Sequence, residues 1–243
     1  MSFTPILLLH GWGGSSASTF GAHGWEEHLA QVDRDVVSID LPGHGPDGGS
    51  HDPDDYSDLA GMLDALIPAG QLDVIGYSLG GKLALELASR QPSRFRRLVI
   101  GGVGDNVFLP ELNGSAVADA LEHGLSDDAS APVRALVEYS AASRSDPLAL
   151  AAVLRRRPNP IATESRLSMI AGDILIVNGT DDHLAHPDER LRHAVGPHRY
   201  AALDGIDHFV LPKTGAFKAL AVQFLEADGD QPFINKTEVA VTR

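Results

Sequence analysis

One short segment of the sequence has the residue types and spacing of an activated nucleophile. Gly76, Ser78 and Gly80 form a Gly-x-Ser-x-Gly pattern, with an apolar run at 72–75 before it and a helical pattern at 79–90 directly after it. So tight a turn requires small neighbours, and it forces the serine into a strained conformation with its hydroxyl above the sheet. The helix directs its positive end at this place, where an anionic intermediate would be stabilised. The pattern therefore predicts a nucleophilic serine.

A glycine-rich loop after the first apolar run has the composition of a hydrogen-bond donor loop. Residues 10–14 read His-Gly-Trp-Gly-Gly. Acyl transfer requires two N–H donors directed at the developing oxyanion. We expect one from the backbone amide of Leu79, next to the nucleophile, and the other from the amide of Trp12. We interpret His10 as a brace for the loop rather than as a metal ligand or a base.

Short apolar runs, alternating with helical patterns, must position these residues. The runs are nearly continuous rather than alternating, except for the last, and this is typical of parallel strands covered on both faces. Strand and helix in repetition imply right-handed crossovers. We therefore predict an α/β fold with a mostly parallel sheet of about six strands flanked by helices. The predicted strands are Ile6–Leu9, Val36–Ile39, Leu72–Ile75, Leu98–Ile100, Ile174–Val177 and Arg199–Leu203.

The interval at 105–172 contains no strand candidate and is too long for a loop of a compact domain. Its alanine- and leucine-rich stretches predict a helical insertion beside the sheet. We accordingly divide the chain into an α/β core at 1–104 and 173–227, a helical insertion at 105–172 and a polar tail at 228–243. The predicted helices are Tyr56–Ile67, Leu79–Arg90, Asp188–Val195 and Thr214–Glu226 in the core, and Ser115–His123, Pro132–Ala142 and Pro147–Arg156 in the insertion.

Taken in order, the motifs between residues 6 and 209 resemble those of the α/β-hydrolase superfamily. The first two strands of the family have no counterpart, and the helical insertion lies where the family carries its lid. The matching segments are the oxyanion loop at 10–14, the turn after the next strand at 40–45, the elbow at 76–80, the acid-bearing strand at 174–182 and the histidine loop at 207–209.

The resemblance implies a catalytic triad in the family order of serine, acid and histidine. This order assigns Ser78 as the nucleophile and His208 as the general base. Asp182, three residues after Gly179, matches the family spacing of the acid.

Two other aspartates remain candidates for the acid. Asp181 is adjacent to Asp182, and Asp105 follows the preceding strand, where some members of the family carry the acid. The residue before the histidine is usually glycine in the family and is Asp207 here.

The resemblance further implies a serine hydrolase that cleaves a carboxylic ester of a small molecule through an acyl-enzyme, with no cofactor and no metal. Thioester, lactone and carbon–carbon bond hydrolysis use the same machinery, so the fold does not choose between them. A receptor-like protein that binds its ligand with little turnover is a further alternative. We expect Gly11, Tyr77 and Phe209 to line the substrate pocket, together with Trp12 and Leu79.

Composition excludes several other classes of function. The 243-residue chain has a formal net charge of -14, which disfavours nucleic acid and anionic membranes as partners because both would repel it. The absence of cysteine excludes disulfides, thiolate zinc sites and a cysteine nucleophile. No apolar run is long enough to cross a bilayer, and no signal peptide is recognisable, so we expect a cytoplasmic protein whose partner is a small acyl substrate. The acidic stretch at 51–55 lacks the spacing of a calcium loop.

Two clusters of ionisable residues have a second interpretation. His183 and His186 have a spacing that metal ligands can have, but no third ligand is evident, so we expect surface or lid contacts. The run Arg155-Arg156-Arg157 is expected to form a solvated face. If this run faced the site instead, it would indicate an acidic substrate.

Overall fold

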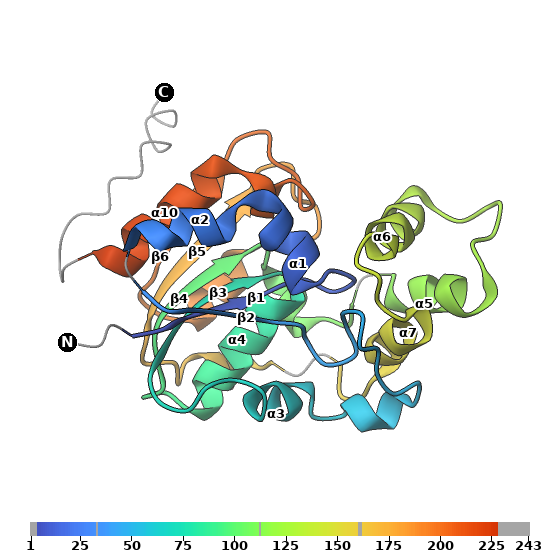
Figure 1. Ribbon diagram of the computed structural model, residues 1–243, viewed down its shortest axis with the longest axis horizontal. Coiled ribbons are helices and arrows are strands. Elements are labelled where there is room, and N and C mark those ends of the chain that lie inside the picture. The colour runs from blue at the N-terminus through green and yellow to red at the C-terminus, as the bar shows by residue number, and fades with distance from the viewer. Residues whose placement is uncertain (1–3, 33, 112, 160–161, 228–243) are drawn as a thin grey trace.

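The computed structural model describes residues 4–227 except 33, 112, 160 and 161, so the predicted polar tail at 228–243 lies outside the described residues. Its centre is a six-stranded sheet in the order β2-β1-β3-β4-β5-β6, in which all neighbouring strands are parallel (Figure 1). This confirms the predicted fold class. The strands are β1 (Ile6–Leu9), β2 (Val36–Ile39), β3 (Leu72–Tyr77), β4 (Phe95–Gly101), β5 (Asp173–Gly179) and β6 (Arg199–Leu203).

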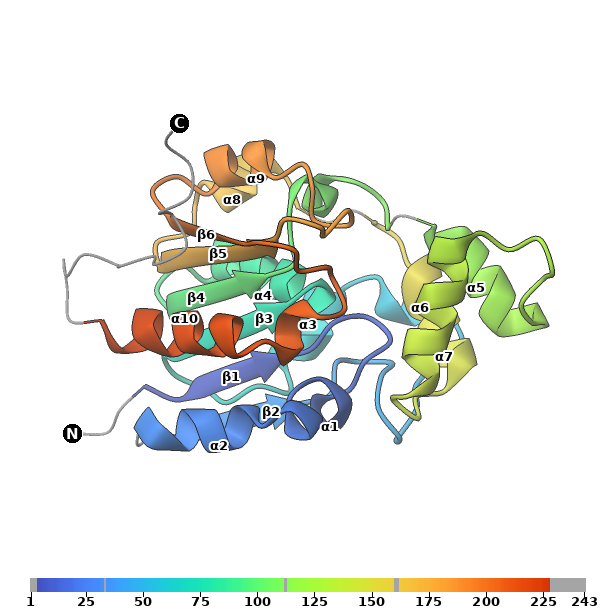
Figure 2. The same cartoon turned by 90° about the horizontal axis from the view of Figure 1, so that it is seen from above.

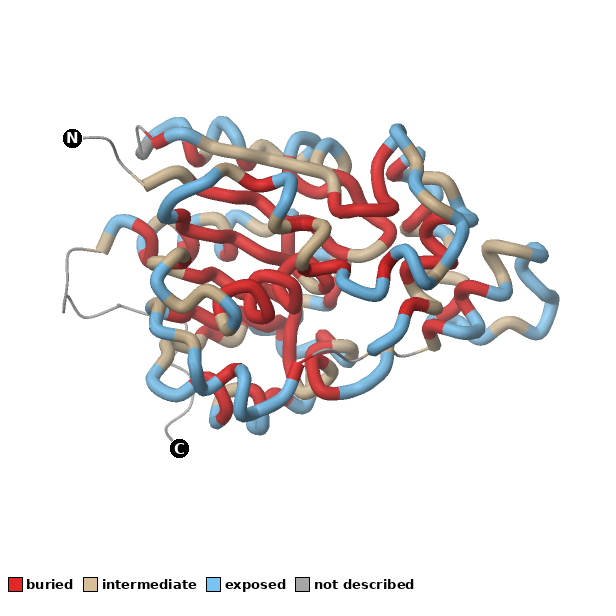
Figure 3. Tube along the Cα trace, turned by 90° about the horizontal axis from the view of Figure 1, so that it is seen from below, coloured by how far each residue is buried: buried red, intermediate tan, exposed pale blue. Residues whose placement is uncertain are grey.

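Helices cover both faces of the sheet, which explains why the strands read as continuous apolar runs. Along β1, Leu7 and Leu9 pack into the core on one face, whereas Ile6 and Leu8 pack into the core on the other. The centre of the molecule is accordingly buried, and exposed segments lie around it (Figure 3). The helices of the first face are α3 (Leu59–Asp64), α4 (Leu79–Arg90), α8 (Glu164–Leu167) and α9 (Glu189–Ala194); those of the second are α2 (Trp25–Leu29) and α10 (Gly215–Glu226).

The carboxyl ends of the strands share one edge of the sheet, where ligands bind in open α/β sheets. The strand order reverses between β1 and β3, so the loop after β1 and the elbow after β3 meet at this edge. Three further helices lie beyond it: α5 (Gly114–His123), α6 (Ala131–Ala141) and α7 (Pro147–Arg155) (Figure 2). We call 114–155 the α5–α7 segment. Its function as a lid, and the division of the chain into core and insertion, remain predictions.

The predicted helix at Tyr56–Ile67 is wrong in its extent. The structure has a 3-10 turn at Pro53–Tyr56 and a separate helix, α3. The break lies at Asp58, whose side chain accepts a hydrogen bond from Gly61 N at 3.1 Å and thereby caps a new helix. The apolar spacing across 56–67 did not reveal this cap.

Several short elements between the strands had no counterpart in the prediction, because segments of three to five residues carry little periodicity. The unpredicted elements are α1 (Ser16–Thr19), α2, α8 and the 3-10 turns at Gly21–His23, Ala30–Val32, Pro53–Tyr56, Asp105–Phe108 and Leu211–Lys213.

None of the described helices is long and apolar enough to cross a bilayer.

Candidate active site

Ser78 occupies a strained turn between β3 and α4. Its backbone has φ 51° and ψ −118°, a conformation that residues with a Cβ rarely adopt. Only glycine fits beside it: a Cβ on Gly80 would lie 2.3 Å from the Leu9 carbonyl oxygen, and one on Gly76 would lie 2.7 Å from Gly81 Cα. The close approach of strand, helix and β1 loop therefore holds the serine in this geometry.

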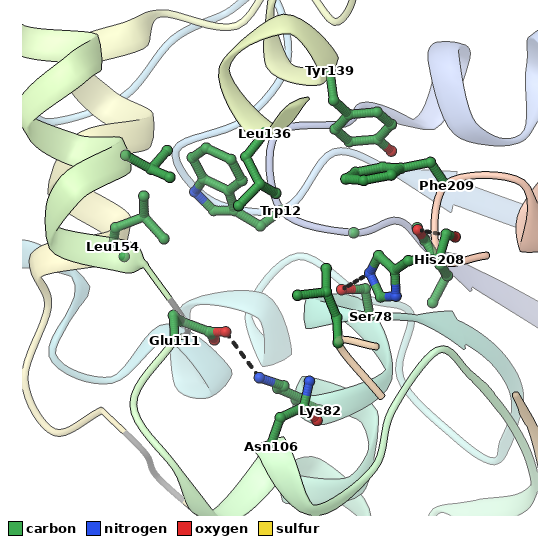
Figure 4. A pocket seen from close by; sticks show the side chains of 15 residues that line it. Trp12, Ser78, Lys82, Asn106, Glu111, Leu136, Tyr139, Leu154, His208 and Phe209 are labelled. Carbon is green, nitrogen blue, oxygen red and sulfur yellow. Dashed lines mark hydrogen bonds and ion pairs between the residues drawn. The ribbon is translucent and has the colours of Figure 1, made fainter. Parts of the chain in front are cut away.

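The predicted nucleophile, base and acid come together as one hydrogen-bonded chain, of which Figure 4 shows the contact between Ser78 and His208. His208 Nε2 is 3.0 Å from Ser78 Oγ, and its Nδ1 is 2.8 Å from Asp182 Oδ2. Asp182 is fully buried, and its other oxygen accepts hydrogen bonds from the backbone amides of Leu184 and Ala185 at 3.0 and 2.9 Å. Because Oδ1 is occupied in this way, Oδ2 remains available to His208.

The two alternative acids lie elsewhere. Asp105 Oδ1 accepts a hydrogen bond from the amide of Leu191 in α9 at 2.9 Å. Asp181 is exposed, and its Oδ1 is 3.4 Å from the Thr180 hydroxyl. Within the described ranges, Asp182 is the carboxylate that contacts the His208 ring.

Tyr77 and Asp207 fix the loop that carries His208. The Tyr77 hydroxyl donates to the His208 carbonyl oxygen at 2.7 Å, and the two rings lie 5.1 Å apart. Burial raises the pKa of Tyr77 well above its ordinary value, so the hydroxyl keeps the proton that it donates. The Asp207 side chain accepts from Val210 N at 2.8 Å and closes the next turn, a role that the usual glycine could not fill.

The two predicted donor amides lie on adjoining segments. Leu79 is the first residue of α4, so its amide has no acceptor within the helix. Gly80 N donates to the His10 carbonyl at 3.0 Å, which joins the start of α4 to the loop at 10–14. Trp12 lies inside the turn that Gly14 N closes onto the Gly11 carbonyl at 3.1 Å. This arrangement brings the two segments together beside Ser78.

Two buried histidines support this loop. His10 Nδ1 donates to the Gly11 carbonyl at 2.8 Å, and its Nε2 accepts from Leu41 N at 3.0 Å. His44 Nδ1 is 3.1 Å from the Pro42 carbonyl. Burial lowers the pKa of His10 to about 4 and that of His44 to about 3. Both rings are therefore neutral near pH 7 and serve as fixed hydrogen-bonding groups.

Because the pKa values of these two histidines are lowered in the folded protein, we expect the protein to lose stability in mild acid. Unfolding restores the pKa of each to about 6.5, so below that pH the unfolded chain binds protons that the folded chain excludes. Stability is therefore lost as the pH falls from about 6.5 towards 4 for His10 and 3 for His44. Between pH 7 and pH 5 we expect a decrease of about 2 kcal/mol for each histidine in the free energy of unfolding.

Urea unfolding at pH 7 and pH 5 measures this loss. The variant His44→Asn, which lacks the titrating ring, should lose about 2 kcal/mol less than the wild type over the same interval. An identical loss in both proteins would contradict the assignment.

A pocket opens above Ser78, between the sheet edge and the α5–α7 segment (Figure 4). The predicted Gly11, Trp12, Tyr77 and Phe209 line it, whereas Leu79 lines a neighbouring cavity instead. The other lining residues are Ser78, Lys82, Asn106, Glu111, Gly114, Val117, Leu136, Tyr139, Leu154, Leu184 and His208.

Sequence reasoning missed the polar part of this lining. Lys82 carried a local signal, because it follows Ser78 by four residues and so lies one helical turn further on the same face of α4. Asn106 and Glu111 carried none, since the segment between β4 and α5 has no periodic pattern that assigns its side chains to the pocket.

The arginine run at 155–157 is only partly a solvated face. Arg155 is half-buried and pairs with Asp119 and Glu122 at 2.6 and 2.7 Å, and Arg157 is exposed. Arg156 is 3% exposed and lies 3.5 Å from Glu111. For Arg156 the prediction of a solvated position is wrong, because the end of α7 turns this side chain inward.

The two histidines near Asp182 form ordinary contacts. His183 is exposed, and His186 Nε2 is 3.0 Å from the Gly179 carbonyl. Across the described part of the chain, no group of three or more His, Cys, Asp or Glu side chains is arranged to hold a metal ion.

Known proteins match this chain in sequence. The family model of the alpha/beta hydrolase fold matches residues 4–122. The 2-hydroxymuconate semialdehyde hydrolase of Pseudomonas putida is 42% identical over 106 residues, 41% of this chain and 37% of the relative. The pimeloyl-[acyl-carrier protein] methyl ester esterase of Nitrosospira multiformis is 26% identical over 221 residues, 75% of this chain and 78% of the relative. In curated relatives that match at 35 to 42% identity, the chain spans 16 to 37% of their length.

Solved structures match over nearly the whole chain. The esterase EaEST from Exiguobacterium antarcticum has a TM-score of 0.71 at 18% identity and covers 93% of both chains. MenH from S. aureus has a TM-score of 0.70 at 20% identity and covers 93% of this chain and 94% of its own. At these identities the structural likeness establishes the fold.

Proposed function

The chain belongs to the α/β-hydrolase superfamily, and from this premise we propose that it is a serine hydrolase that cleaves a carboxylic ester of a small molecule. The observation that carries the proposal is the chain of hydrogen bonds from Ser78 Oγ through His208 to the buried Asp182 carboxylate, 3.0 and 2.8 Å long. A serine at positive φ that faces both a base and a pocket has the arrangement that nucleophilic catalysis requires.

In the proposed mechanism Ser78 Oγ attacks the ester carbonyl carbon while its proton passes to His208 Nε2. Asp182 holds Nδ1–H and stabilises the imidazolium. The amides of Trp12 and Leu79 bind the oxyanion, and the loss of one such donor typically costs about 3–4 kcal/mol of transition-state stabilisation.

The tetrahedral intermediate then collapses with cleavage of the carbon–oxygen bond. His208 returns its proton to the leaving alkoxide, and the acyl group remains on Ser78. Water attacks the acyl carbonyl, gives its proton to His208 and releases the carboxylic acid. The serine finally recovers its proton from His208.

Active-site labelling with a fluorophosphonate tests this proposal. The probe should modify Ser78 of the folded protein, as located by mass spectrometry, and Ser78→Ala should not be labelled. Ser89 lies in the same helix and its hydroxyl is bonded to the Glu86 carbonyl at 2.7 Å, so Ser89→Ala is a matched control that should label normally. A folded wild-type protein that takes up no probe would overturn the hydrolase proposal and favour a ligand-binding protein.

Carbon–carbon bond hydrolysis is the second candidate. It is supported by the local match of 42% identity to the 2-hydroxymuconate semialdehyde hydrolase of Pseudomonas putida, because the compound in that name contains no ester bond. The same serine, histidine and aspartate would act, so labelling does not separate the two reactions. A panel of acyl esters and vinylogous diketones does: faster turnover of the diketones than of any ester would replace ester cleavage with this reaction.

A further inference from the structure

Three charged side chains meet at one end of the pocket, which Lys82 and Glu111 line, whereas Arg156 lines the neighbouring cavity. Lys82 Nζ is 2.9 Å from Glu111 Oε2, and Arg156 Nη2 is 3.5 Å from Glu111 Oε1. The side chains are 9, 21 and 3% exposed for Lys82, Glu111 and Arg156. Two cations therefore share one carboxylate in a place with little access to water.

The group carries an uncompensated positive charge. Although burial by itself raises the pKa of Glu111, the charges of Lys82 and Arg156 bring that pKa below its ordinary value, so the carboxylate is ionised near pH 7. In the part of the chain that the structure describes, neither cation has a second acidic partner, and Arg156 Nε has no hydrogen-bond partner. A buried excess charge is costly unless something pairs with it.

One of the two cations, Lys82, faces the space where a substrate would lie. Lys82 and Glu111 line the pocket of Ser78, and Asn106 lines it beside them (Figure 4). The Lys82 ammonium has three N–H donors, of which one is directed to Glu111. Asn106 Oδ1 accepts from Gly104 N at 3.1 Å, which leaves the amide NH₂ of Asn106 as a further donor. This end of the pocket thus offers hydrogen-bond donors and positive charge.

The opposite end of the pocket is aromatic. The rings of Tyr139 and Phe209 lie 5.2 Å apart there, away from Lys82 and Glu111 (Figure 4). A substrate that fits both ends has an apolar part and a charged part. The net charge of -14 would repel an anion at long range, but solvent screens charges beyond roughly 8 Å at physiological salt, so recognition has to come from the buried Lys82 ammonium in the pocket.

We propose that the Lys82 end of the pocket binds a carboxylate carried by the substrate, so that the protein selects anionic over neutral acyl compounds of equal length. Charge-assisted hydrogen bonds of this kind are roughly twice as strong as neutral ones. The inference rests on the proposed function for the chemistry at Ser78, but binding of the anion does not require turnover.

Calorimetric titration of the Ser78→Ala protein tests the binding directly. The probes are the monomethyl esters of the dicarboxylic acids of four to eight carbons, which carry one carboxylate, each matched with the neutral methyl ester of the monocarboxylic acid of equal length. We expect the best anionic monoester to bind about ten- to hundredfold more tightly than its neutral counterpart. Adding Lys82→Met should remove this preference, whereas adding Lys82→Arg should keep it. Lys213 is exposed, so Lys213→Met is the control for the change in net charge and should also keep the preference.

Equal binding of the anionic and the neutral ester, binding of neither, or a preference that survives Lys82→Met would overturn the inference. Its failure is distinguishable from failure of the proposed function. If fluorophosphonate labels Ser78 but no anion preference is found, only the proposed anion subsite is contradicted. If an anion preference is found but Ser78 is not labelled, only the proposed hydrolase activity is contradicted.

Discussion

Replacing Ser78 by glycine should abolish turnover and at the same time yield a more stable protein than Ser78→Ala. Both variants lack the nucleophile, and loss of the serine of such a triad lowers kcat by about 10⁶-fold. The two differ in the backbone, because alanine retains the Cβ that makes φ 51° unfavourable and glycine does not. Strain of this kind costs about 1–3 kcal/mol. Glycine loses about 0.5–1 kcal/mol through the greater freedom of its unfolded chain, so its net advantage should be about 1 kcal/mol.

Ester turnover and urea unfolding of the two variants measure the two effects separately. Ser89→Ala serves as the control in both assays, since its hydroxyl donates to the backbone carbonyl of Glu86 within α4. Near-normal turnover in Ser78→Ala would show that Ser78 is not the nucleophile. A glycine variant that is less stable than the alanine variant would show that the elbow stores no strain, whatever the chemistry.

The strands of the core were predictable because their sequence pattern reports burial directly. A parallel strand that is covered on both faces tolerates few polar residues, so each run of apolar letters marks a strand. The prediction ended β3 at Ile75, but the strand continues to Tyr77. Gly76 and Tyr77 interrupt the apolar run, yet both are buried. There is no space for a side chain at Gly76, and the polar hydroxyl of Tyr77 is satisfied by its hydrogen bond to the loop of His208.

The parts of the site that follow a local motif could be predicted from the sequence, and the parts that depend on packing could not. Ser78 and His208 sit in short motifs next to predicted strands. Glu111 and Arg156, by contrast, are distant in sequence from each other and from Lys82, and the packing of the α5–α7 segment brings them together. Helical periodicity indicates which residues share a helix face, but it does not specify which helix that face meets.

The choice among Asp182, Asp181 and Asp105 likewise depended on three-dimensional packing. Asp105 follows its strand at a distance that some family members use for the acid. The carboxylate of Asp105 instead accepts a hydrogen bond from the amide of Leu191 in α9. No pattern near Asp105 encodes the approach of that helix, so the sequence alone left the alternatives open.

Asp182→Asn should lower kcat by about 10⁴-fold, whereas Asp105→Asn and Asp181→Asn should remain within a few-fold of the wild type. The reason lies in the two oxygens of Asp182. Oδ1 accepts from the amides of Leu184 and Ala185, so an asparagine has to place its carbonyl oxygen there and its NH₂ towards His208 Nδ1. An NH₂ donor at this position requires an unprotonated Nδ1. The ring proton then moves to Nε2, which faces Ser78 Oγ and can no longer accept the serine proton.

The pH profile separates this tautomer effect from simple loss of structure. A base of the wrong tautomer leaves the protein folded, with an unfolding free energy near that of the wild type and a low kcat around neutral pH. Part of the lost rate should return at high pH, because hydroxide can take the serine proton that His208 no longer accepts. Asp105→Asn retains an oxygen for the Leu191 amide and Asp181 is exposed, so both variants are matched controls for the change in charge. Near-normal turnover in Asp182→Asn, or a 10⁴-fold loss in either control, would show that another residue is the acid of the triad.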